Sequence, residues 1–475
     1  QSVMAEGGIN AALNTKDEND SPEEHFTDTI KAACGLADPN AVWGMTQAAP
    51  ELVHWLIKLG VKFNMSGYDD VDLRNFGGQK KKRTAFAQSD TGKQIMTAMI
   101  DAVRRKEASG MVERFSHHSF LTLRLCGNIC CGCVIRDEYS QETVELPGDA
   151  VIVATGGMHG LFGNTTGSLS NTGEVTAELF RLGVPLANGE MIQYHPTTVK
   201  CGGKRMLISE AARGEGGRLF AMKDGKQWYF MEEKYPELGN LMPRDITARE
   251  IWKVSHESEV FLDMTEISEE IISNKLSGLA DDCMTYLHKD IRKEPVSVLP
   301  GIHYFMGGIL VDEQHRTPIQ NLYAAGECCA QYHGANRLGG NSLLGALYGG
   351  RVAAKSACEQ ADVVDLSCAT QIDFPPASQI SEIKQLNKVM QETMGVVRNE
   401  NTLLNGIQTV QALTGNLPLL GMAVLKSALA RKESRGAHWR EDYPKSNDDD
   451  YLKTTVARFD GKQIQISFVP VPERR

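Results

Sequence analysis

Eight polar residues of this chain, most of them beside glycine or proline, could together bind a small anion and act on it. They are His195, Ser209, Glu210, Arg213, Glu215, Arg244, His303 and Arg337. Any one of them alone says little, because a single histidine or arginine is more often a core or surface residue than a ligand. As a set they place many cationic donors in a chain whose net charge is −10. Guanidinium and imidazole groups pair well with carboxylates, so the set favours a small dicarboxylate held at both ends.

The segment 334–344, Gly-Ala-Asn-Arg-Leu-Gly-Gly-Asn-Ser-Leu-Leu, follows a strand expected at 322–325 and opens a helix. Its glycines allow the backbone to approach a ligand closely, and we expect Asn341 and Ser342 to cap the helix. The free N–H groups at that helix end favour an anion or an electron-rich ring. Glu327, after the strand, could bind the hydroxyls of a nucleotide sugar. The pattern therefore predicts a cofactor and an acidic substrate side by side.

The length of 475 residues is enough for more than one domain, at ~100–200 residues per domain. Hydrophobic residues make up 41% and charged residues 23%, as in ordinary globular proteins. The net negative charge argues against a general nucleic-acid surface, and no apolar run approaches the ~20 residues that span a bilayer. The 11 scattered cysteines favour a reducing compartment over a disulfide framework, so we expect the protein in the cytoplasm.

Four closely spaced cysteines raise the question of a metal or iron–sulfur site. They are Cys126, Cys130, Cys131 and Cys133. No second half-site with matching spacing follows, so we expect no metal ligands here. We predict instead a β-hairpin over 121–137, with Gly127 and Asn128 in its turn and the cysteines as small apolar strand residues.

The elements that must position the polar set follow from hydrophobic periodicity. Helices are expected at 38–60, 91–107, 174–183, 343–358, 380–394, 401–414 and 417–431. Residues 150–154 form an apolar strand that runs into a glycine turn, which is typical of the buried centre of a parallel sheet. Residues 204–300 are more charged, and we interpret them as an inserted domain. The alternating apolar residues near 464–468 predict a terminal strand.

These residues belong to an ordered series of motifs that resembles the flavoprotein subunit of the fumarate reductase/succinate dehydrogenase family, which also contains L-aspartate oxidase. The series includes Ala5-Glu6-Gly7-Gly8, Phe76-Gly77-Gly78, Ala154-Thr155-Gly156-Gly157, Gln193-Tyr194-His195-Pro196-Thr197, Arg213-Gly214-Glu215-Gly216-Gly217, Pro243-Arg244-Asp245, His303-Tyr304-Phe305-Met306-Gly307-Gly308, His333-Gly334-Ala335-Asn336-Arg337 and Arg431-Lys432-Glu433-Ser434-Arg435-Gly436-Ala437-His438. Each motif alone is weak, whereas their order along nearly the whole chain is specific.

The resemblance implies an α/β fold: a Rossmann-like FAD-binding domain with an inserted α+β capping domain, followed by a C-terminal helical domain with a terminal strand. We place the FAD-binding domain at 1–190 and 302–362, the capping domain at 191–301 and the helical domain at 363–475. The family's opening strand and glycine fingerprint are missing. The chain therefore looks like a fragment whose site for the adenosine half of the cofactor is incomplete.

By the same resemblance, FAD is expected to contact Ala5, Glu6, Gly7, Gly8, Thr155, Gly156, Gly157, Glu327, Asn341, Ser342 and Leu343. The helix end at the last three would meet the pyrimidine end of the flavin and favour its anionic reduced form. Membrane-bound members carry a histidine that bonds covalently to flavin just before the Ala-Glu-Gly-Gly stretch, where this chain has Gln1. We therefore expect non-covalent FAD.

The implied reaction is hydride transfer between flavin N5 and one olefinic carbon of fumarate, with a proton exchanged at the other carbon. The residues expected to bind the substrate are His195, Ser209, Glu210, His303, Arg337 and Phe76, with Glu210 orienting its neighbours. Arg244 would be the proton donor, resupplied through Glu215 and Arg213. A guanidinium has a very high pKa, so it can donate only to a strongly basic carbanion; otherwise Arg244 is an electrostatic clamp.

Three other functions stay open. L-aspartate oxidase needs a carboxylate near the substrate ammonium group, and Phe76 stands where the aspartate oxidases resemble one another in having Glu. A reductase of another α,β-unsaturated acid is the second, although donors for both ends argue against a monocarboxylate. A catalytically inactive flavoprotein that serves as an assembly subunit is the third, and the intact His195, Arg244, His303 and Arg337 argue against it.

The chain has no iron–sulfur ligands of its own, so by resemblance we expect an iron–sulfur subunit or another electron-transfer protein to dock, helped by the helical domain. Its role would be electron transport, as in anaerobic respiration. Any membrane contact would be indirect, through partner subunits at the cytoplasmic face. Redox partners rather than these residues decide whether fumarate is reduced or succinate is oxidised.

Overall fold

The computed structural model describes residues 2–67, 70–168, 170–363, 372, 374 and 379–475. Gln1, on which the expectation of non-covalent FAD depends, lies outside these residues. Most of the positions between 364 and 378, at the predicted start of the helical domain, lie outside them too.

Two short strands from distant parts of the chain pair in parallel: β7 (Val151–Val153) and β17 (Leu322–Ala324). Leu322 lies opposite Val151, and Ala324 lies opposite Val153. Both strands are as the sequence predicts, and the parallel pairing agrees with the parallel sheet expected around 150–154. β7 is less buried than an apolar run suggests, because the side chain of Ile152 is 40% exposed.

Helix α10 (Asn341–Gln360) follows β17 and begins where the sequence predicts, but its cap differs. The N-cap residue is Gly340, whose φ of +83° is a left-handed conformation that suits glycine. The predicted caps were Asn341 and Ser342. Asn341 is instead the first helical residue, and its side chain donates to Thr29 Oγ1 (3.0 Å) and accepts from Asn10 Nδ2 (2.7 Å). Because the side chain of Asn341 makes these buried hydrogen bonds, it does not cap the helix.

Three further helices form the N-terminal part of the fold with α10. They are α1 (Pro22–Ala32), α2 (Pro39–Lys58) and α3 (Thr91–Ala108). α2 begins where the side chain of Asp38 accepts the N–H group of Asn40 (2.9 Å) and Pro39 fills the first turn. Its apolar side, including Met45 and Leu52, is fully buried in a core shared with α3 and α10. Beside this core lies the sheet β1 (Ile9–Asn10), β3 (Thr84–Ala85) and β2 (Leu73–Arg74).

A three-stranded antiparallel sheet contains the predicted hairpin. Its strands are β4 (His118–Cys126), β5 (Ile129–Asp137) and β6 (Thr143–Pro147). The hairpin prediction is confirmed, with Cys126 opposite Ile129 across a turn in which Gly127 has a φ of +60°. Cys130 and Cys131 are buried free thiols, as expected of small apolar strand residues, whereas Cys126 is disulfide-bonded and departs from that expectation. Among the described residues, no group of three or more His, Cys, Asp or Glu side chains could hold a metal ion.

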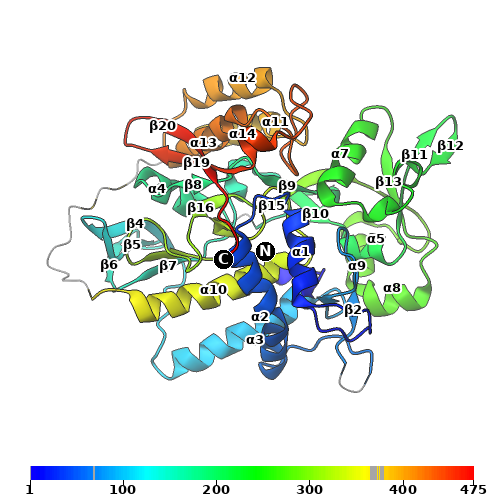
Figure 1. Cartoon of the computed structure of the whole chain (residues 1–475), viewed down its shortest axis with the longest axis horizontal. Helices are drawn as coiled ribbons and strands as arrows, with labels where there is room; N and C mark the ends of the chain where they lie inside the picture. The colour runs from blue at the N-terminus through cyan, green and yellow to red at the C-terminus, as the bar shows by residue number, and fades with distance from the viewer. Residues whose placement is uncertain (1, 68–69, 169, 364–371, 373, 375–378) are drawn as a thin grey trace.

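The middle of the chain builds two sheets with helices around them. In the first, β9 (Ile192–Cys201) lies between β10 (Lys204–Leu207) and β15 (Leu299–Phe305). The second has β11 (Arg218–Lys223), β12 (Lys226–Trp228), β13 (Val260–Asp263) and β14 (Val296–Ser297). The helices are α5 (Glu210–Gly214), α6 (Phe230–Lys234), α7 (Arg244–Val254), α8 (Glu269–Lys275) and α9 (Ser277–Asp282). Leu219, Ile251 and Leu262 belong to a hydrophobic core of this region, shown green in Figure 1.

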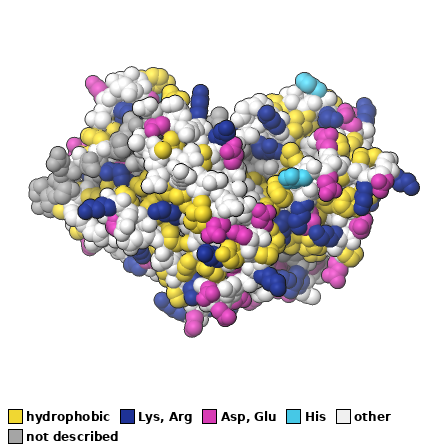
Figure 2. Space-filling view, turned by 90° about the horizontal axis from the view of Figure 1, so that it is seen from above, with side chains coloured by type: hydrophobic (Ala, Val, Ile, Leu, Met, Phe, Trp, Pro, Cys, Tyr) yellow, Lys and Arg dark blue, Asp and Glu magenta, His cyan; other side chains and the backbone are white. Residues whose placement is uncertain are grey.

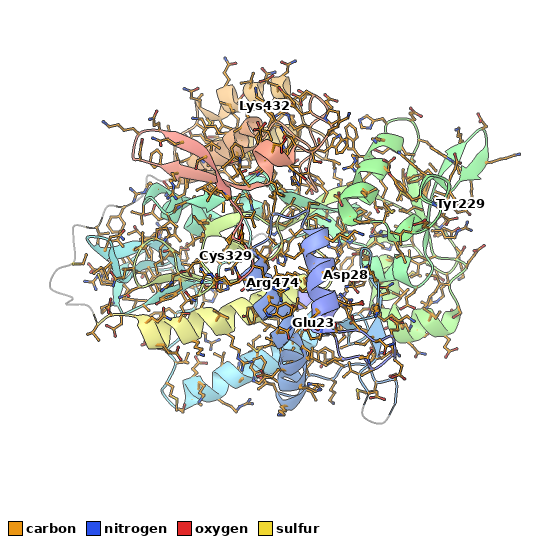
Figure 3. The ribbon with its side chains drawn as sticks, viewed as in Figure 1. Glu23, Asp28, Tyr229, Cys329, Lys432 and Arg474 are labelled. Atoms are coloured by element: carbon orange, nitrogen blue, oxygen red, sulfur yellow. The ribbon has the colours of Figure 1, made fainter. Side chains whose placement is uncertain are left out.

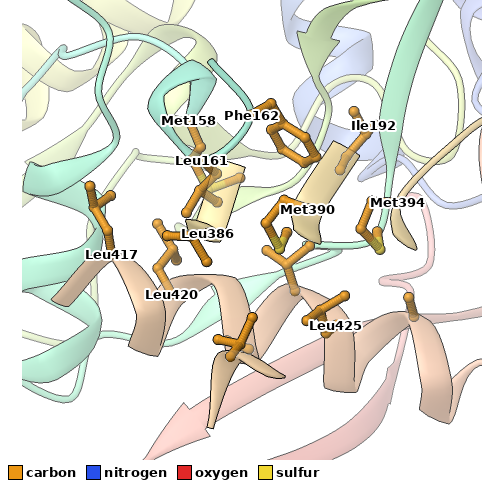
Figure 4. Close-up of a cluster of buried hydrophobic side chains, with 14 of the residues drawn as sticks. Met158, Leu161, Phe162, Ile192, Leu386, Met390, Met394, Leu417, Leu420 and Leu425 are labelled. Carbon is orange, nitrogen blue, oxygen red and sulfur yellow. The ribbon is translucent and has the colours of Figure 1, made fainter. Parts of the chain in front are cut away.

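The C-terminal helices pack against the segment that precedes β9. They are α11 (Ile380–Thr393), α12 (Glu400–Val410) and α13 (Asn416–Ala430), as predicted, with the short α14 (Asp448–Tyr451) after them. Leu386 and Leu420 meet Met158 and Phe162 in the core drawn in Figure 4. α13 also contacts α4 (Glu174–Arg181), another predicted helix.

The last two strands complete a sheet begun much earlier in the chain. β19 (Lys453–Phe459) pairs with β8 (Leu186–Ala187) on one side and with β20 (Ile464–Pro470) on the other. β16 (Gly308–Leu310) and β18 (Cys329–Ala330) extend the same sheet, in the order β18-β16-β8-β19-β20. The terminal strand is as predicted and pairs with the preceding strand β19, which joins it to β8 from far away in sequence.

The C-terminal tail returns to the N-terminal helices. The guanidinium of Arg474 lies 3.8 Å from the ring of Trp43 on α2 and 4.9 Å from that of Phe26 on α1, and Figure 3 labels it. On the face shown in Figure 2, acidic and basic side chains are interspersed rather than segregated. In the described part of the chain, no helix has both the length and the apolar character needed to cross a lipid bilayer.

Candidate active site

A cavity of about 590 Å³ collects residues from the N-terminal segment, β9, α5, α7, β15 and α10. Its volume is typical of sites for small molecules and cofactors. The predicted site residues that line it are Ala5, Glu6, Gly7, Gly8, Phe76, Gly156, His195, Ser209, Glu210, Arg244, His303, Glu327, Arg337, Ser342 and Leu343. The structure therefore brings most of the predicted set to one place.

Five predicted site residues do not line this cavity: Thr155, Gly157, Asn341, Arg213 and Glu215. Gly157 lies against the cavity residue Glu327, since a Cβ atom there would be 2.7 Å from the Oε1 of Glu327. Asn341 takes part in the buried cluster described above. Arg213 lies buried behind Glu210, at 3.8 Å. Glu215 points elsewhere and pairs with Lys275 at 3.0 Å.

Two histidines from neighbouring strands face the cavity together. The rings of His195 on β9 and His303 on β15 lie edge to face, with centroids 5.2 Å apart. Burial and then the nearby Arg244 hold the pKa of each histidine well below its usual range. Both imidazoles are therefore neutral and can each donate one N–H group. Among the described residues, nothing hydrogen-bonds the buried Nε2 of His195.

Arg337 lines the cavity and has no carboxylate partner within the described part of the chain. Its guanidinium lies 4.4 Å over the ring of Tyr304, and its side chain is buried. Burial, followed by the repulsion from Arg244, lowers the pKa of Arg337 to about 9, so the group is still charged at neutral pH. A buried cation without a counter-ion is costly, and an anionic ligand would compensate it.

Arg244, at the start of α7, makes a close ion pair with Glu210. Its Nε and Nη2 donate to Glu210 Oε2 at 2.7 and 2.6 Å. The other oxygen of Glu210 accepts the N–H of Gly77 at 3.0 Å and faces Arg213. Burial alone would raise the pKa of Glu210, but Arg244 and Arg213 outweigh it and hold that pKa below its ordinary value. Glu210, and not Glu215, is therefore the carboxylate between the two arginines.

Gln193 connects the two parts of the site. Its Oε1 accepts from Arg244 Nη1 at 3.1 Å, and its Nε2 donates to the carbonyl oxygen of Arg337 at 2.9 Å. The residue belongs to the Gln-Tyr-His-Pro-Thr motif, but nothing in that motif alone assigned it a role. The same holds for Tyr304, which lies beside His303 in another motif. Their membership in these motifs was the signal that could have identified them.

The cavity is also lined by residues expected to bind a cofactor. Burial, with a smaller contribution from Asp282, raises the pKa of Glu6 to about 8. Its buried Oε2 has no hydrogen-bond partner among the described residues. Glu327 accepts the N–H of Phe305 at 3.1 Å, and Ser342 lines the cavity at the first turn of α10.

These groups fit a flavin nucleotide. The carboxylate of Glu327 suits sugar hydroxyls, and a protonated Glu6 can donate a hydrogen bond to the ligand. The N–H groups of the first turn of α10 that follow Asn341 point out of the helix end and suit the carbonyl oxygens of the ring. The cavity thus offers a place for FAD beside the cluster of histidines and arginines.

Comparison with known proteins agrees with this geometry. Residues 1–343 match the family described as FAD binding domain, and residues 413–474 match the fumarate reductase flavoprotein C-terminal family. The chain is 37% identical over 538 residues to the succinate dehydrogenase flavoprotein subunit of Bacillus subtilis, covering 100% of this chain and 92% of that protein. It is 31% identical over 536 residues to the 8-methylmenaquinol:fumarate reductase flavoprotein subunit of Wolinella succinogenes, covering 100% and 86%. It is 32% identical over 516 residues to the L-aspartate oxidase of Nostoc sp., covering 96% and 87%.

Solved structures show the same fold of mixed helices and sheets. A variant of E. coli quinol fumarate reductase superposes with a TM-score of 0.89 at 27% identity, covering 99% of this chain and 90% of that one. A quinol–fumarate reductase with menaquinol molecules gives 0.86 at 27% identity, covering 100% and 91%. The chain therefore belongs to the FAD-dependent flavoprotein family of succinate dehydrogenases and fumarate reductases, which also includes L-aspartate oxidase.

Proposed function

We propose that this chain is the flavoprotein subunit of a fumarate reductase or succinate dehydrogenase and interconverts fumarate and succinate. One observation carries the proposal: His195, His303, Arg244 and Arg337 line a single cavity next to the groups that fit FAD. The identity to relatives named succinate dehydrogenase and fumarate reductase supports it.

The donors of the cavity suit a molecule with a carboxylate at each end. Arg337 brings a charge that is not paired with a carboxylate among the described residues, and His195 and His303 bring the ring nitrogens of neutral imidazoles. Ser209 lines the cavity beside Glu6, and its Oγ accepts the N–H of Ala211 at 3.3 Å. Donors that meet negative charge as it develops in a substrate contribute about 3 kcal/mol each to lowering the barrier.

FAD, when bound, would supply or take up the hydride. Arg244 is placed to give the proton to the neighbouring carbon, because it lines the cavity and is held by Glu210 and Gln193. The carbanion-like carbon is basic enough to take a proton from a guanidinium. Glu210 is ionised, because the two arginines hold its pKa low, so it passes to Arg244 a proton that it first receives from the side of Arg213. This relay replaces the one through Glu215, whose carboxylate is engaged by Lys275.

L-aspartate oxidase is the second candidate, because a relative of that name is 32% identical. A substrate ammonium group needs a free carboxylate near the reacting carbon. Glu210 is engaged by two arginines, and Phe76 presents an apolar ring to the cavity. Both observations favour a dicarboxylate without an amino group.

Three further parts of the proposal depend on the family resemblance. FAD is held without a covalent bond, an iron–sulfur subunit or another electron-transfer protein exchanges electrons with it, and the protein works in the cytoplasm, in contact with a membrane only through its partners. Copurification of an iron–sulfur protein with the full-length chain is the observation that would support the second part.

The test is made on the full-length protein loaded with FAD. The flavin is reduced without oxygen, fumarate is added, and the flavin absorbance is followed. We expect rapid re-oxidation by fumarate and a loss of at least about 10²-fold in Arg244→Lys, the loss expected for a general acid. Arg218→Lys, at a partly exposed arginine paired with Glu232, should keep the wild-type rate. Re-oxidation only by oxygen, together with turnover of aspartate, would instead support the oxidase.

A further inference from the structure

Two adjacent threonines, Thr165 and Thr166, lie in the loop between β7 and α4. Each hydroxyl contacts the Nδ1 atom of a different histidine. One of these histidines faces the carboxylate predicted to hold the cofactor, and the other lines the substrate end of the cavity. A single turn of backbone thus touches both halves of the site.

On the cofactor side, the hydrogen bonds of Thr165 indicate which ring nitrogen of His159 carries the proton. The backbone N–H of Gly167 donates to Thr165 Oγ1 at 3.1 Å, so the threonine hydroxyl can give its own proton to His159 Nδ1 at 2.9 Å. An imidazole that accepts at Nδ1 carries its proton on Nε2. The Nε2 of His159 lies 3.5 Å from Oε1 of Glu327, close but without hydrogen-bond geometry, and no other described residue hydrogen-bonds it. His159 therefore presents an N–H group to the carboxylate of Glu327.

The packing around His159 holds its ring in this orientation. Its side chain is buried, and its ring meets Phe305 edge to face at 5.0 Å. A Cβ atom at Gly167 would lie 2.3 Å from the ring, so glycine is needed there for the histidine to fit. The ring can neither turn freely nor exchange its partner with solvent.

On the substrate side, Thr166 Oγ1 lies 2.8 Å from His303 Nδ1. The backbone N–H of Thr166 donates to the carbonyl oxygen of Ile302 at 3.0 Å, which fixes the threonine next to the strand that carries the histidine. The hydroxyl is also 3.4 Å from that carbonyl oxygen, but the contact with His303 is much shorter. Donation to Nδ1 leaves the proton of the neutral His303 on Nε2, as a carboxylate ligand requires.

We propose that Thr165 and Thr166 are two positioning residues with separate tasks in one loop. Thr165 acts on FAD through His159 and Glu327, and Thr166 acts on the dicarboxylate through His303. The second task depends on the proposed function, because it assumes that His303 binds a substrate carboxylate. The first task depends only on the binding of FAD.

The test compares valine and serine at each position in the full-length protein. Valine keeps the shape of threonine and removes the hydroxyl, and serine keeps the hydroxyl. Two quantities are measured: the rate of FAD release, from the rise of its fluorescence, and the dissociation constant of fumarate, from the change in the spectrum of the oxidised flavin. We expect Thr165→Val to speed FAD release about ten-fold and to leave fumarate binding unchanged. Thr166→Val should weaken fumarate binding about ten-fold and leave FAD release unchanged.

Both serine variants should behave like the wild type. A double variant tests the chain of contacts on the cofactor side. His159→Phe keeps a ring and removes both nitrogens, so it should speed FAD release as Thr165→Val does. The combination should be no faster than either single variant, because both changes remove the same interaction. If a valine variant does not fold, the alanine variant at the same position takes its place with the same expectation.

Several results would overturn the proposal. One is a pair of valine variants that alter both quantities alike, or serine variants that fail to restore them. Another is a Thr165→Val protein that releases FAD no faster than the wild type. A wild-type protein that binds FAD but no C4 dicarboxylate would refute the proposed function, and the task of Thr166 with it. FAD release would still decide the task of Thr165.

Discussion

The guanidinium of Arg337 lies over the ring of Tyr304, 4.4 Å from its centre, and both side chains are buried. The ring stabilises the cation through its face and takes none of its hydrogen-bond donors. The donors of Arg337 can therefore remain directed at a ligand, which a carboxylate partner would prevent.

Replacing Tyr304 by Leu should raise the KM for fumarate about ten-fold, because a desolvated cation–π contact contributes about 1–2 kcal/mol. Tyr304→Phe keeps the ring and should leave KM close to that of the wild type. Steady-state kinetics of both variants make the comparison. Equal effects of Leu and Phe would mean that the hydroxyl group, and not the ring face, matters.

Glu210→Gln should lower kcat by about 10²-fold or more, because the substituted amide cannot return a proton to Arg244. Glu215→Gln is its matched control, since that carboxylate pairs with the partly exposed Lys275. It should keep near wild-type activity and change the free energy of unfolding by about 0.5 kcal/mol or less. A large loss of kcat in Glu215→Gln and a small one in Glu210→Gln would restore the relay predicted from the sequence.

The raised pKa of Glu6 makes stability depend on pH. Its carboxyl ionises at about 8 in the folded protein against 4.5 ordinarily, because of burial and then Asp282, partly offset by Arg74. Between these values the unfolded chain binds fewer protons than the folded one. The free energy of unfolding should therefore fall as pH rises through this window, by at most about 1.4 kcal/mol per pH unit, and stop falling above it.

Glu6→Gln should remove this contribution, so that its advantage in stability over the wild type grows between pH 5 and pH 8. Urea unfolding of the FAD-free full-length protein at several pH values measures the difference. Parallel pH profiles for the two proteins would show that Glu6 does not ionise abnormally.

Gly436 supports the loop that carries Arg337. Ala437 donates its N–H to the carbonyl oxygen of Ala335 at 2.9 Å, and a Cβ atom at Gly436 would lie 2.5 Å from that oxygen. Gly436→Ala should shift this loop and raise the KM for fumarate about ten-fold or more. Gly461 is the control glycine, because its φ is also positive, at +90°, and no atom lies within 4 Å of its added Cβ.

Gly461→Ala should therefore cost about 1 kcal/mol of stability and leave KM unchanged. Kinetics and denaturant midpoints of the two alanine variants separate the effect of backbone strain from that of the contact. Equal KM values in both would show that the loop of Arg337 tolerates the displacement.

Much of this architecture could be predicted from local pattern. Periodicity and glycine positions locate α2, α3, α4, α10 and the C-terminal helices, and the apolar runs locate β7 and β17. These features depend on neighbouring residues, so the chain reveals them directly. The series of motifs predicted the cavity because most of them supply part of its wall, although 213–217 and 431–438 do not.

Other features depend on packing between distant segments, which no local pattern encodes. Glu210 and Glu215 are both close to Arg213 in sequence. Only the position of α7 in the fold decides that Glu210 forms the ion pair with Arg244. In the same way, Asn341 fails to cap α10 because Asn10 and Thr29 arrive from the other end of the chain to bond it.

The sheet that joins β8 to β19 has a consequence for biosynthesis. The exposed edge of β8, at Leu186 and Ala187, receives its neighbour only when residues 456–457 have left the ribosome. At about 5–20 residues translated per second, the incomplete sheet has an unpaired, aggregation-prone edge strand for many seconds. The nascent chain can aggregate through this edge, and a chaperone that covers the edge during translation should raise the yield of soluble protein.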